Sequence, residues 1–268
     1  MVVDSFKGFA TTFILIFWGK HMKKVLLLIV FVLIFCVGAV GLYNKVNEYK
    51  KGEEEYNELE QYFVQSDGIS QTQDDNSNNS QDNVSAPTVN FIELLTVNKD
   101  IVAWIYIPGT SISYPVVQGQ DNSYYVSHTV KGSKNKSGAI FLDCANSSDF
   151  SDTNSIIYGH NLQNGRMFSG LRKFLNSTYI GEHKEIVIYT LNEEIHYNIA
   201  SAFKVNKYSD IYKKKNIEDK EELKIFFRDV CKLDESIDTA NIISLSTCTN
   251  VDKDERIVVI AYRDKGNA

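Results

Sequence analysis

The sequence predicts a mainly β domain, a closed or nearly closed eight-stranded barrel, that follows an N-terminal transmembrane helix. Three observations predict this arrangement. Beyond residue 100, eight short runs rich in Val, Ile, Tyr and Phe are separated by turn signals such as Pro108-Gly109. A single amphipathic helical pattern interrupts these runs. A long uncharged apolar run precedes the whole region.

The composition limits the classes of protein and partner. The chain has 268 residues, enough for one substantial domain with attachments. It carries 28 Lys and Arg against 34 Asp and Glu, so it lacks the basic balance of a nucleic-acid-binding domain and we expect no nucleic-acid partner. Of four cysteines, one lies in the apolar run; the other three are an odd number without zinc-type spacing. We therefore expect no metal, no disulfide framework and at least one free thiol.

The N-terminal region predicts a membrane anchor over residues 22–44. Val25–Tyr43 holds no charge, and at about 1.5 Å per residue a helix of this length approaches the ~30 Å hydrocarbon layer. A cleavable signal peptide has a shorter apolar core, so we expect the segment to remain attached. Met22-Lys-Lys before this run resembles a natural start, so residues 1–21 are expected to be a non-native or short cytoplasmic extension.

Residues 45–87 are expected to connect this anchor to the folded domain. The first part is charged and predicts a helix that continues from the membrane. Ser66–Pro87 is rich in Ser, Asn, Asp and Gln without apolar periodicity, which predicts a flexible polar linker because such a segment cannot bury a core. We place the folded domain at residues 88–268.

The elements of this domain follow from local periodicity. Val89–Val97 has the apolar spacing of an N-terminal helix. A second helix is expected over Asn216–Lys232, inserted before the last pair of strands, since Leu223, Phe226 and Phe227 share one face. The expected strands are Val102–Ile107, Ser113–Val117, Ala139–Leu142, Ser155–Tyr158, Ile186–Leu191, Ile195–Val205, Ile242–Thr247 and Ile257–Tyr262.

Three polar residues lie at the ends of expected strands. Cys248 follows the expected strand Ile242–Thr247, a position that holds a nucleophile in place and leaves it accessible. The alternative is a buried structural thiol, since free Cys is often buried. His160 follows Gly159 at another strand end, and Arg256 opens the strand after Cys248. A structural histidine and a surface arginine paired with a nearby carboxylate are the alternatives for these two.

Together the three residue types supply the parts of an acyl transfer. A thiol needs a neighbouring cation to become a thiolate near neutral pH. The leaving amine needs an acid, and the oxyanion needs a hydrogen-bond donor. Cys248, His160 and Arg256 match these roles without a metal, provided that the fold brings them together.

The region from Thr88 onward resembles the class B sortases. The resemblance rests on seven stretches that cover most of the domain, and on the helix inserted before the Cys248 strand. The stretches are Ile107-Pro-Gly-Thr, Ser113-Tyr-Pro-Val-Val-Gln, Asp121-Asn-Ser-Tyr-Tyr, Gly138-Ala-Ile-Phe-Leu-Asp, Asp149-Phe-Ser-Asp, Ile156-Ile-Tyr-Gly-His-Asn and Leu245-Ser-Thr-Cys followed by Arg256.

The resemblance implies a sortase-type β-barrel transpeptidase. Cys248 would attack the Thr carbonyl of a C-terminal sorting motif, of Asn-Pro-x-Thr-x type, and form a thioacyl enzyme. His160 would exchange protons with the departing and incoming amines, and Arg256 would stabilise the oxyanion or orient the substrate. By the same resemblance, the substrate-binding residues would be Asn122, Val126, Ser246 and Thr247.

The resemblance also implies partners and a location. The substrates would be secreted proteins with a sorting signal, the acceptor an amine of peptidoglycan or lipid II, and the location the cell membrane, with a single span and an extracellular catalytic domain. No cofactor follows from this mechanism. A membrane-tethered cysteine protease that uses the same three residues, and a non-catalytic surface protein with a sortase-like barrel, remain as alternatives.

Overall fold

A computed structural model describes residues 3–64, 87–234, 236–237 and 240–263, with side chains from residue 24 onward. The chain divides into two compact units, Met1–Lys50 and Lys51–Ala268. The expected linker over Ser66–Pro87 lies almost entirely outside the described residues.

The first unit is helical. It consists of most of α1 (Val3–Leu59), whose residues from Val25 to Tyr43 are exposed apolar side chains with few exceptions. Among the described residues, one helix is long and apolar enough to cross a membrane, and it includes this stretch. A candidate membrane span is therefore present where the sequence predicts it.

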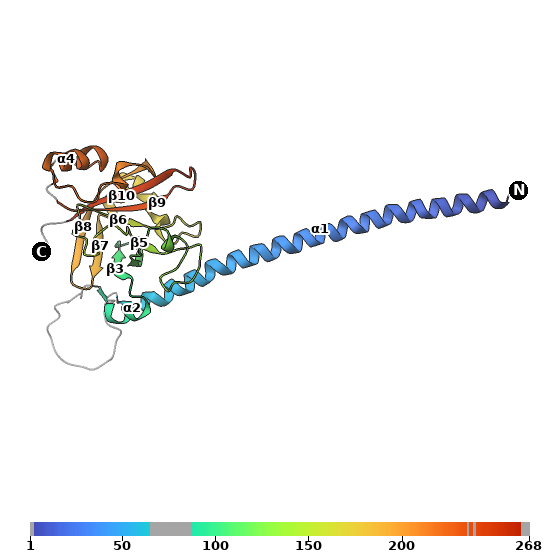
Figure 1. The fold of residues 1–268 in the computed structure, drawn as a ribbon, viewed down its shortest axis with the longest axis horizontal. Helices are drawn as coiled ribbons and strands as arrows, with labels where there is room; N and C mark the ends of the chain where they lie inside the picture. Colours follow the sequence, from blue (N-terminus) through green and yellow to red (C-terminus); the bar gives the residue numbers. More distant parts are fainter. Residues whose placement is uncertain (1–2, 65–86, 235, 238–239, 264–268) are drawn as a thin grey trace, which may run out of the picture. The chain divides into compact units, whose positions relative to one another are not determined.

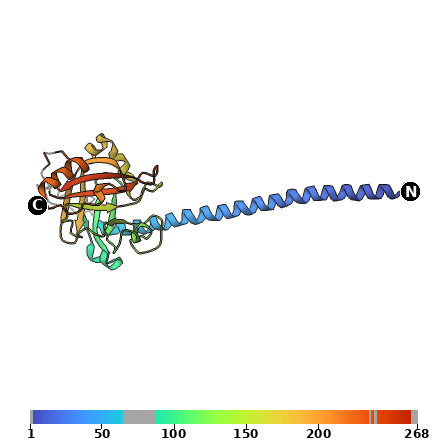
Figure 2. The same ribbon diagram turned by 45° about the horizontal axis from the view of Figure 1, so that its top comes forward.

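The second unit is built on a closed eight-stranded barrel (Figures 1 and 2). The strands follow the order β10-β8-β7-β3-β4-β5-β6-β9, and β9 pairs with β10 to close it. All neighbours are antiparallel except β4 with β5 and β6 with β9, which are parallel. The strands are β3 (Ile101–Tyr106), β4 (Ser113–Val117), β5 (Ile140–Leu142), β6 (Asn154–Tyr158), β7 (Glu185–Thr190), β8 (Glu194–Asn206), β9 (Ile242–Cys248) and β10 (Glu255–Arg263). Each lies within two residues of a predicted strand, so the expected barrel is confirmed.

Short elements complete the unit. α2 (Phe91–Val97) is the predicted N-terminal helix, and the Asn90 side chain caps it by accepting from the backbone of Glu93 at 3.2 Å. Four further short elements lie in connections between strands: η2 (Tyr124–Val126), η3 (Phe168–Leu175), α3 (Ser177–Glu182) and η4 (Asp210–Tyr212).

The folded unit begins earlier in the chain than the expected boundary at Thr88. The last turns of α1 and η1 (Glu60–Tyr62) lead into β1 (Phe63–Val64), which pairs with β2 (Thr88–Val89) in a small sheet of its own. Tyr56, Leu59 and Phe63 bury their side chains in the main hydrophobic core. The segment after Lys51 therefore belongs to the same compact unit as the barrel, although its charged residues favoured a connecting segment.

Alternation along β9 and β10 gives the barrel two hydrophobic faces. Ile243 and Leu245 belong to the main core, whereas Ile242 belongs to a second, smaller core that also contains Val258 of β10. The smaller core is covered by η5 (Phe226–Val230) through Phe226 and Phe227, and Leu223 of α4 (Lys220–Ile225) packs against it. β9 is buried on both faces, and its buried polar side chains have hydrogen-bond partners: the Ser244 hydroxyl donates to the Asn154 side chain at 2.7 Å, and the Thr247 hydroxyl donates to the Gly159 carbonyl at 2.8 Å.

The inserted helix is shorter than predicted. It starts at Lys220 rather than Asn216, because Asp219 accepts hydrogen bonds from the backbone of Glu221 and Glu222 at 3.0 and 2.8 Å. Its second half, η5, is a π-helix rather than an α-helix. The predicted apolar face is nevertheless the one that packs on the barrel.

Candidate active site

Cys248 is the last residue of β9 and is a half-buried free thiol. The strand before it is wholly buried, and this fixes the backbone position of its final residue. Its carbonyl accepts a 2.7 Å hydrogen bond from the Asn161 side chain. The thiol is therefore positioned and partly accessible, in contrast to Cys231, which is fully buried in the smaller core.

Arg256 lies directly opposite Cys248 in the antiparallel pair of β9 and β10. Side chains of directly opposed residues lie on the same face of a sheet, with Cβ atoms about 4.5–5.5 Å apart. Nη1 of Arg256 donates to the carbonyls of Lys253 and Glu255 at 2.9 and 3.0 Å, and these bonds orient the guanidinium.

The alternative reading of Arg256, as the partner of a nearby carboxylate, does not describe this arrangement. Among the residues that the structure describes, no carboxylate forms an ion pair with Arg256. Asp254 pairs with Lys207 at 2.7 Å and Glu255 with Lys204 at 3.0 Å. The Asp254 and Glu255 side chains thus have lysine partners, and Arg256 lines the same pocket as Cys248.

His160 reaches the end of β9 because β6 runs parallel to it, with Tyr158 opposite Ser246. Two further contacts extend this pairing beyond β6: the Gly159 N–H donates to the Ser246 carbonyl at 3.1 Å, and the Thr247 hydroxyl donates to the Gly159 carbonyl at 2.8 Å. His160 follows at once and is half-buried. Its Nε2 lies 2.7 Å from the Val126 carbonyl oxygen.

All seven site residues named from the sequence line one pocket of about 370 Å³. They are Asn122, Val126, His160, Ser246, Thr247, Cys248 and Arg256. The pocket opens over the ends of β6 and β9, and loops from other parts of the chain complete it. The fold therefore brings Cys248, His160 and Arg256, the three polar residues at strand ends, to the same pocket.

Five further residues line the pocket without having been predicted. Phe141 and Tyr158 lie within the stretches that resemble class B sortases, as does Gly159, so a signal for them was present. Lys207 and Tyr212 lie between β8 and α4, in a segment without periodicity, and only the fold brings them to the pocket.

Tyr212 connects the wall of the pocket to the nucleophile strand. Its hydroxyl lies 2.8 Å from the Ser246 hydroxyl, and its ring stacks on Tyr158 with centroids 6.2 Å apart. Burial raises the pKa of Tyr212 to about 12, although the Ser246 hydrogen bond and the charge of Arg256 oppose this rise. Tyr212 therefore stays neutral near pH 7.

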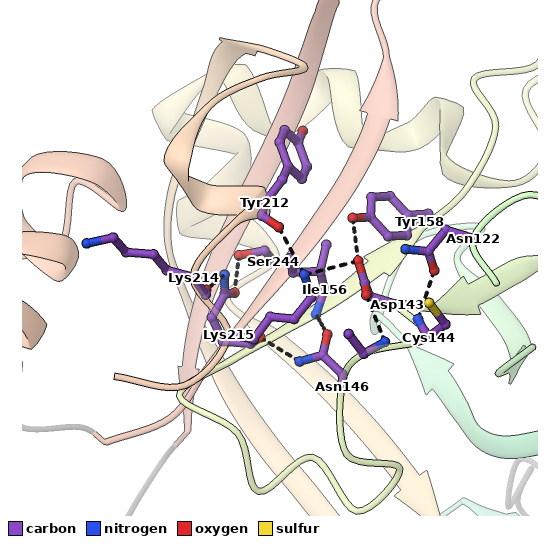
Figure 3. Close-up of polar contacts among 12 residues, drawn as sticks. Asn122, Asp143, Cys144, Asn146, Ile156, Tyr158, Tyr212, Lys214, Lys215 and Ser244 are labelled. Carbon is purple, nitrogen blue, oxygen red and sulfur yellow. Dashed lines mark hydrogen bonds and ion pairs between the residues drawn. The ribbon is translucent and has the colours of Figure 1, made fainter. Parts of the chain in front are cut away.

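Asn122 takes part in the pocket through a fixed side chain. Its amide oxygen accepts a 2.8 Å hydrogen bond from the backbone N–H of Cys144 (Figure 3). The Cys144 residue is exposed and does not line the pocket.

Comparisons with known proteins agree with this arrangement. The family model described as "Sortase domain" matches residues 105–264. A sortase B of Staphylococcus aureus is 31% identical over 179 residues, which cover 64% of this chain and 73% of that protein. A sortase B of Listeria monocytogenes is 45% identical over 91 residues, which cover 34% of this chain and 37% of that protein.

The fold gives the same result. The crystal structure of Clostridium perfringens sortase B is 30% identical, with a TM-score of 0.60, over 65% of this chain and 100% of that one. The family match extends over more than half of the chain and includes all but one of the eight barrel strands in full. The chain therefore belongs to the sortase family and, by its relatives, to class B.

Proposed function

We propose that this protein is a membrane-anchored transpeptidase. It would cleave a C-terminal sorting motif, of Asn-Pro-x-Thr-x type, after Thr and transfer the acyl group to an amine of peptidoglycan or lipid II. The observation that carries the proposal is the register pair of Cys248 and Arg256, which sets a permanent cation beside an accessible thiol in a pocket that His160 also lines.

In the first half of the reaction, the thiolate of Cys248 attacks the Thr carbonyl. The guanidinium of Arg256 stabilises the negative charge that develops on the carbonyl oxygen, or orients the peptide. The C–N bond breaks, and His160 gives its proton to the departing amine. The product of this half is a thioester between Thr and Cys248.

In the second half, His160 takes a proton from the incoming amine. The amine attacks the thioester, an amide bond forms and the thiolate leaves. Because the Val126 carbonyl can only accept a hydrogen bond, Nε2 of His160 carries a hydrogen throughout. Nδ1 is therefore the nitrogen that gains and loses the proton. Asn122, Val126, Ser246 and Thr247 would contact the peptide in this scheme.

Two solved structures of relatives support peptide partners. One solved structure is a Staphylococcus aureus sortase B–substrate complex, and another is a sortase B complexed with triglycine. By analogy, the partners of this chain would be secreted proteins with a sorting signal and a cell-wall amine. The apolar part of α1 would hold the enzyme in the membrane as a single span, with the catalytic domain outside the cell.

The test uses the full chain in detergent micelles with a sorting peptide, with and without an added amine, and identifies products by mass spectrometry. We expect a new amide product that requires the amine and a thioester on Cys248. Cys248→Ala should abolish both while the fold is retained, and His160→Ala should lower the rate by about 10²–10⁴-fold. The matched control is Cys144→Ser, which removes a thiol that does not line the pocket.

Two results would contradict the proposal in different ways. Hydrolysis at the same rate and to the same product with and without amine would indicate a cysteine protease. A chain that forms no covalent adduct with the peptide under any condition would indicate a non-catalytic surface protein.

A further inference from the structure

A buried carboxylate lies behind the pocket without belonging to it. Asp143 directly follows β5, and its side chain is 3% exposed. The carboxylate accepts from the backbone N–H of Ala145 at 3.0 Å and from the hydroxyl of Tyr158 at 2.9 Å. It also forms an ion pair with Nζ of Lys215 at 3.4 Å (Figure 3). A buried charge requires such partners, so this group has fixed geometry.

Two of these partners lead to the aromatic wall of the pocket. Tyr158 lines the pocket and packs on Phe141 with ring centroids 5.2 Å apart. Burial and the negative charge of Asp143 raise the pKa of Tyr158, which keeps its hydroxyl protonated and able to donate. The carboxylate thus fixes the orientation of this ring through its hydroxyl.

The second route passes through Lys215. Its ammonium group donates to the backbone carbonyl of Tyr212 at 3.0 Å as well as pairing with Asp143 (Figure 3). Lys215 is 17% exposed, so solvent screens this pair less than it screens a surface ion pair. Asp143 therefore holds Tyr158 directly and Tyr212 by way of one lysine.

The segment that carries Tyr212 depends on side-chain contacts of this kind. Between β8 and α4 its only regular element is η4, a single short turn. Asn154 of β6 attaches the same segment by donating to the carbonyls of Ile211 and Lys214 at 2.9 and 3.1 Å. The Lys215–Asp143 pair attaches the residues that follow η4 to the end of β5. Loss of this pair would leave the segment with the Tyr212–Ser246 contact, the bonds of Asn154, which include one from its backbone N–H to the Lys215 carbonyl, and the 2.8 Å bond from Asn216 to Asp152.

We propose that Asp143 and Lys215 are positioning residues that fix Tyr158 and Tyr212 as the pocket wall, and that they thereby govern peptide binding rather than the reactivity of Cys248. Neither residue lines the pocket, and each acts through a tyrosine. This inference rests on the proposed function for its kinetic consequence. Its structural part, the attachment of residues 207–216, does not depend on any activity.

The experiment compares Lys215→Met with Lys213→Met in the full chain. Lys213 is a matched control, because it lies two residues away, is 63% exposed and pairs only with Asp210 among its described ion-pair partners. In hydrogen–deuterium exchange, we expect the amides of residues 207–216 to exchange about tenfold faster in Lys215→Met and at the wild-type rate in Lys213→Met. Unchanged exchange in Lys215→Met would overturn the inference, whatever the enzyme does.

The kinetic measurement separates positioning from general destabilisation. For Lys215→Met and Asp143→Asn we expect KM for the sorting peptide to rise about fivefold, with little change in kcat, and Lys215→Arg to restore KM. Alkylation of Cys248 by iodoacetamide should keep its wild-type rate. Partial unfolding alone would lower kcat, through loss of active enzyme, and leave KM unchanged, and this result would overturn the inference.

A milder variant tests the same inference if Lys215→Met or Asp143→Asn does not fold. Tyr158→Phe removes one hydroxyl and keeps the ring, and we expect it to raise KM in the same direction. If KM of Tyr158→Phe equals that of the wild type, the carboxylate does not act through this ring and the inference fails. If the wild-type chain turns over no peptide, the proposed function fails, and the exchange experiment alone decides whether the pair holds Tyr212.

Discussion

The hydroxyl of Tyr56 donates a 2.7 Å hydrogen bond to the carbonyl of Gly138, across a separation of 82 residues. Gly138 lies against the loop that contains η2 (Tyr124–Val126). A Cβ atom placed at Gly138 would be 2.7 Å from the Tyr125 carbonyl oxygen and 2.9 Å from Cδ2 of His160. Glu55 supports the same loop by accepting from the Thr129 hydroxyl at 2.8 Å. The last turns of α1 therefore help to hold the loop that contacts the histidine.

A chain that starts at Thr88 should be much less stable than one that starts at Lys51. The shorter chain loses Tyr56, Leu59 and Phe63 from the core, and each fully buried apolar side chain contributes roughly 1.5–3 kcal/mol. Such a loss is a large part of the stability of a typical domain, about 5–15 kcal/mol. Denaturant unfolding of the two chains measures the difference. Equal midpoints would contradict the assignment of this segment to the domain.

Gly138→Ala should destabilise the domain and lower turnover together. The residue has φ of +59° and no room for a Cβ, so the substitution combines backbone strain with displacement of the loop beside His160. The control is Gly165→Ala, where φ is +83° but no atom lies within 4 Å of the added Cβ. Unfolding and peptide turnover are measured for both. If the two variants behave alike, the contact with the loop has no effect of its own.

Under the proposed mechanism, Arg256→Ala should lower kcat/KM by about 10²–10³-fold, because it removes the group proposed to stabilise the oxyanion or orient the peptide. Arg256→Lys keeps the charge but not the two bonds from Nη1 to the Lys253 and Glu255 carbonyls, so it should restore only part of the rate. Steady-state kinetics with the sorting peptide tests this order. Full recovery in the lysine variant would indicate that charge alone is required.

Cys231 should make the protein less stable in alkaline solution. Burial raises the pKa of this thiol from 9.0 to about 12. Between these values the unfolded chain loses the proton and the folded chain keeps it, so the free energy of unfolding decreases as pH rises. The contribution is fully present below pH 9.0, and one such group changes the slope by about 1.4 kcal/mol per pH unit.

The measurement follows urea unfolding from pH 8 to pH 11 in the wild type and in Cys231→Ala, with these pH values chosen to be about one unit below and two units above the ordinary thiol pKa. The variant loses packing and starts from a lower stability, so the comparison is of slopes. We expect a shallower decline in the variant. Parallel curves would show that this thiol does not titrate differently in the two states.

Much of the fold could be predicted because its signals are local. Apolar runs bounded by turn residues gave all eight strands of the barrel, and the helical face of Phe226 and Phe227 is the one that packs. The predicted length of the inserted helix exceeds the observed one. A few hydrogen bonds decide where this helix begins, at the Asp219 cap, and where its π-helical part follows. The charged sequence after Lys51 favoured a connector, whereas Tyr56, Leu59 and Phe63 of this segment pack into the main core, a contact with distant residues that no local pattern signals.

The sequence by itself determined which residues have the chemistry of the site: a thiol, an imidazole and a guanidinium, each at the end of a strand, within stretches that resemble class B sortases. Only the tertiary structure decided that they share a pocket with Tyr158 and Tyr212, and that Asp143 lies behind both rings. The physical reason is that strand ends are encoded by neighbouring residues, whereas strand register and loop attachment depend on pairings between residues far apart in the chain.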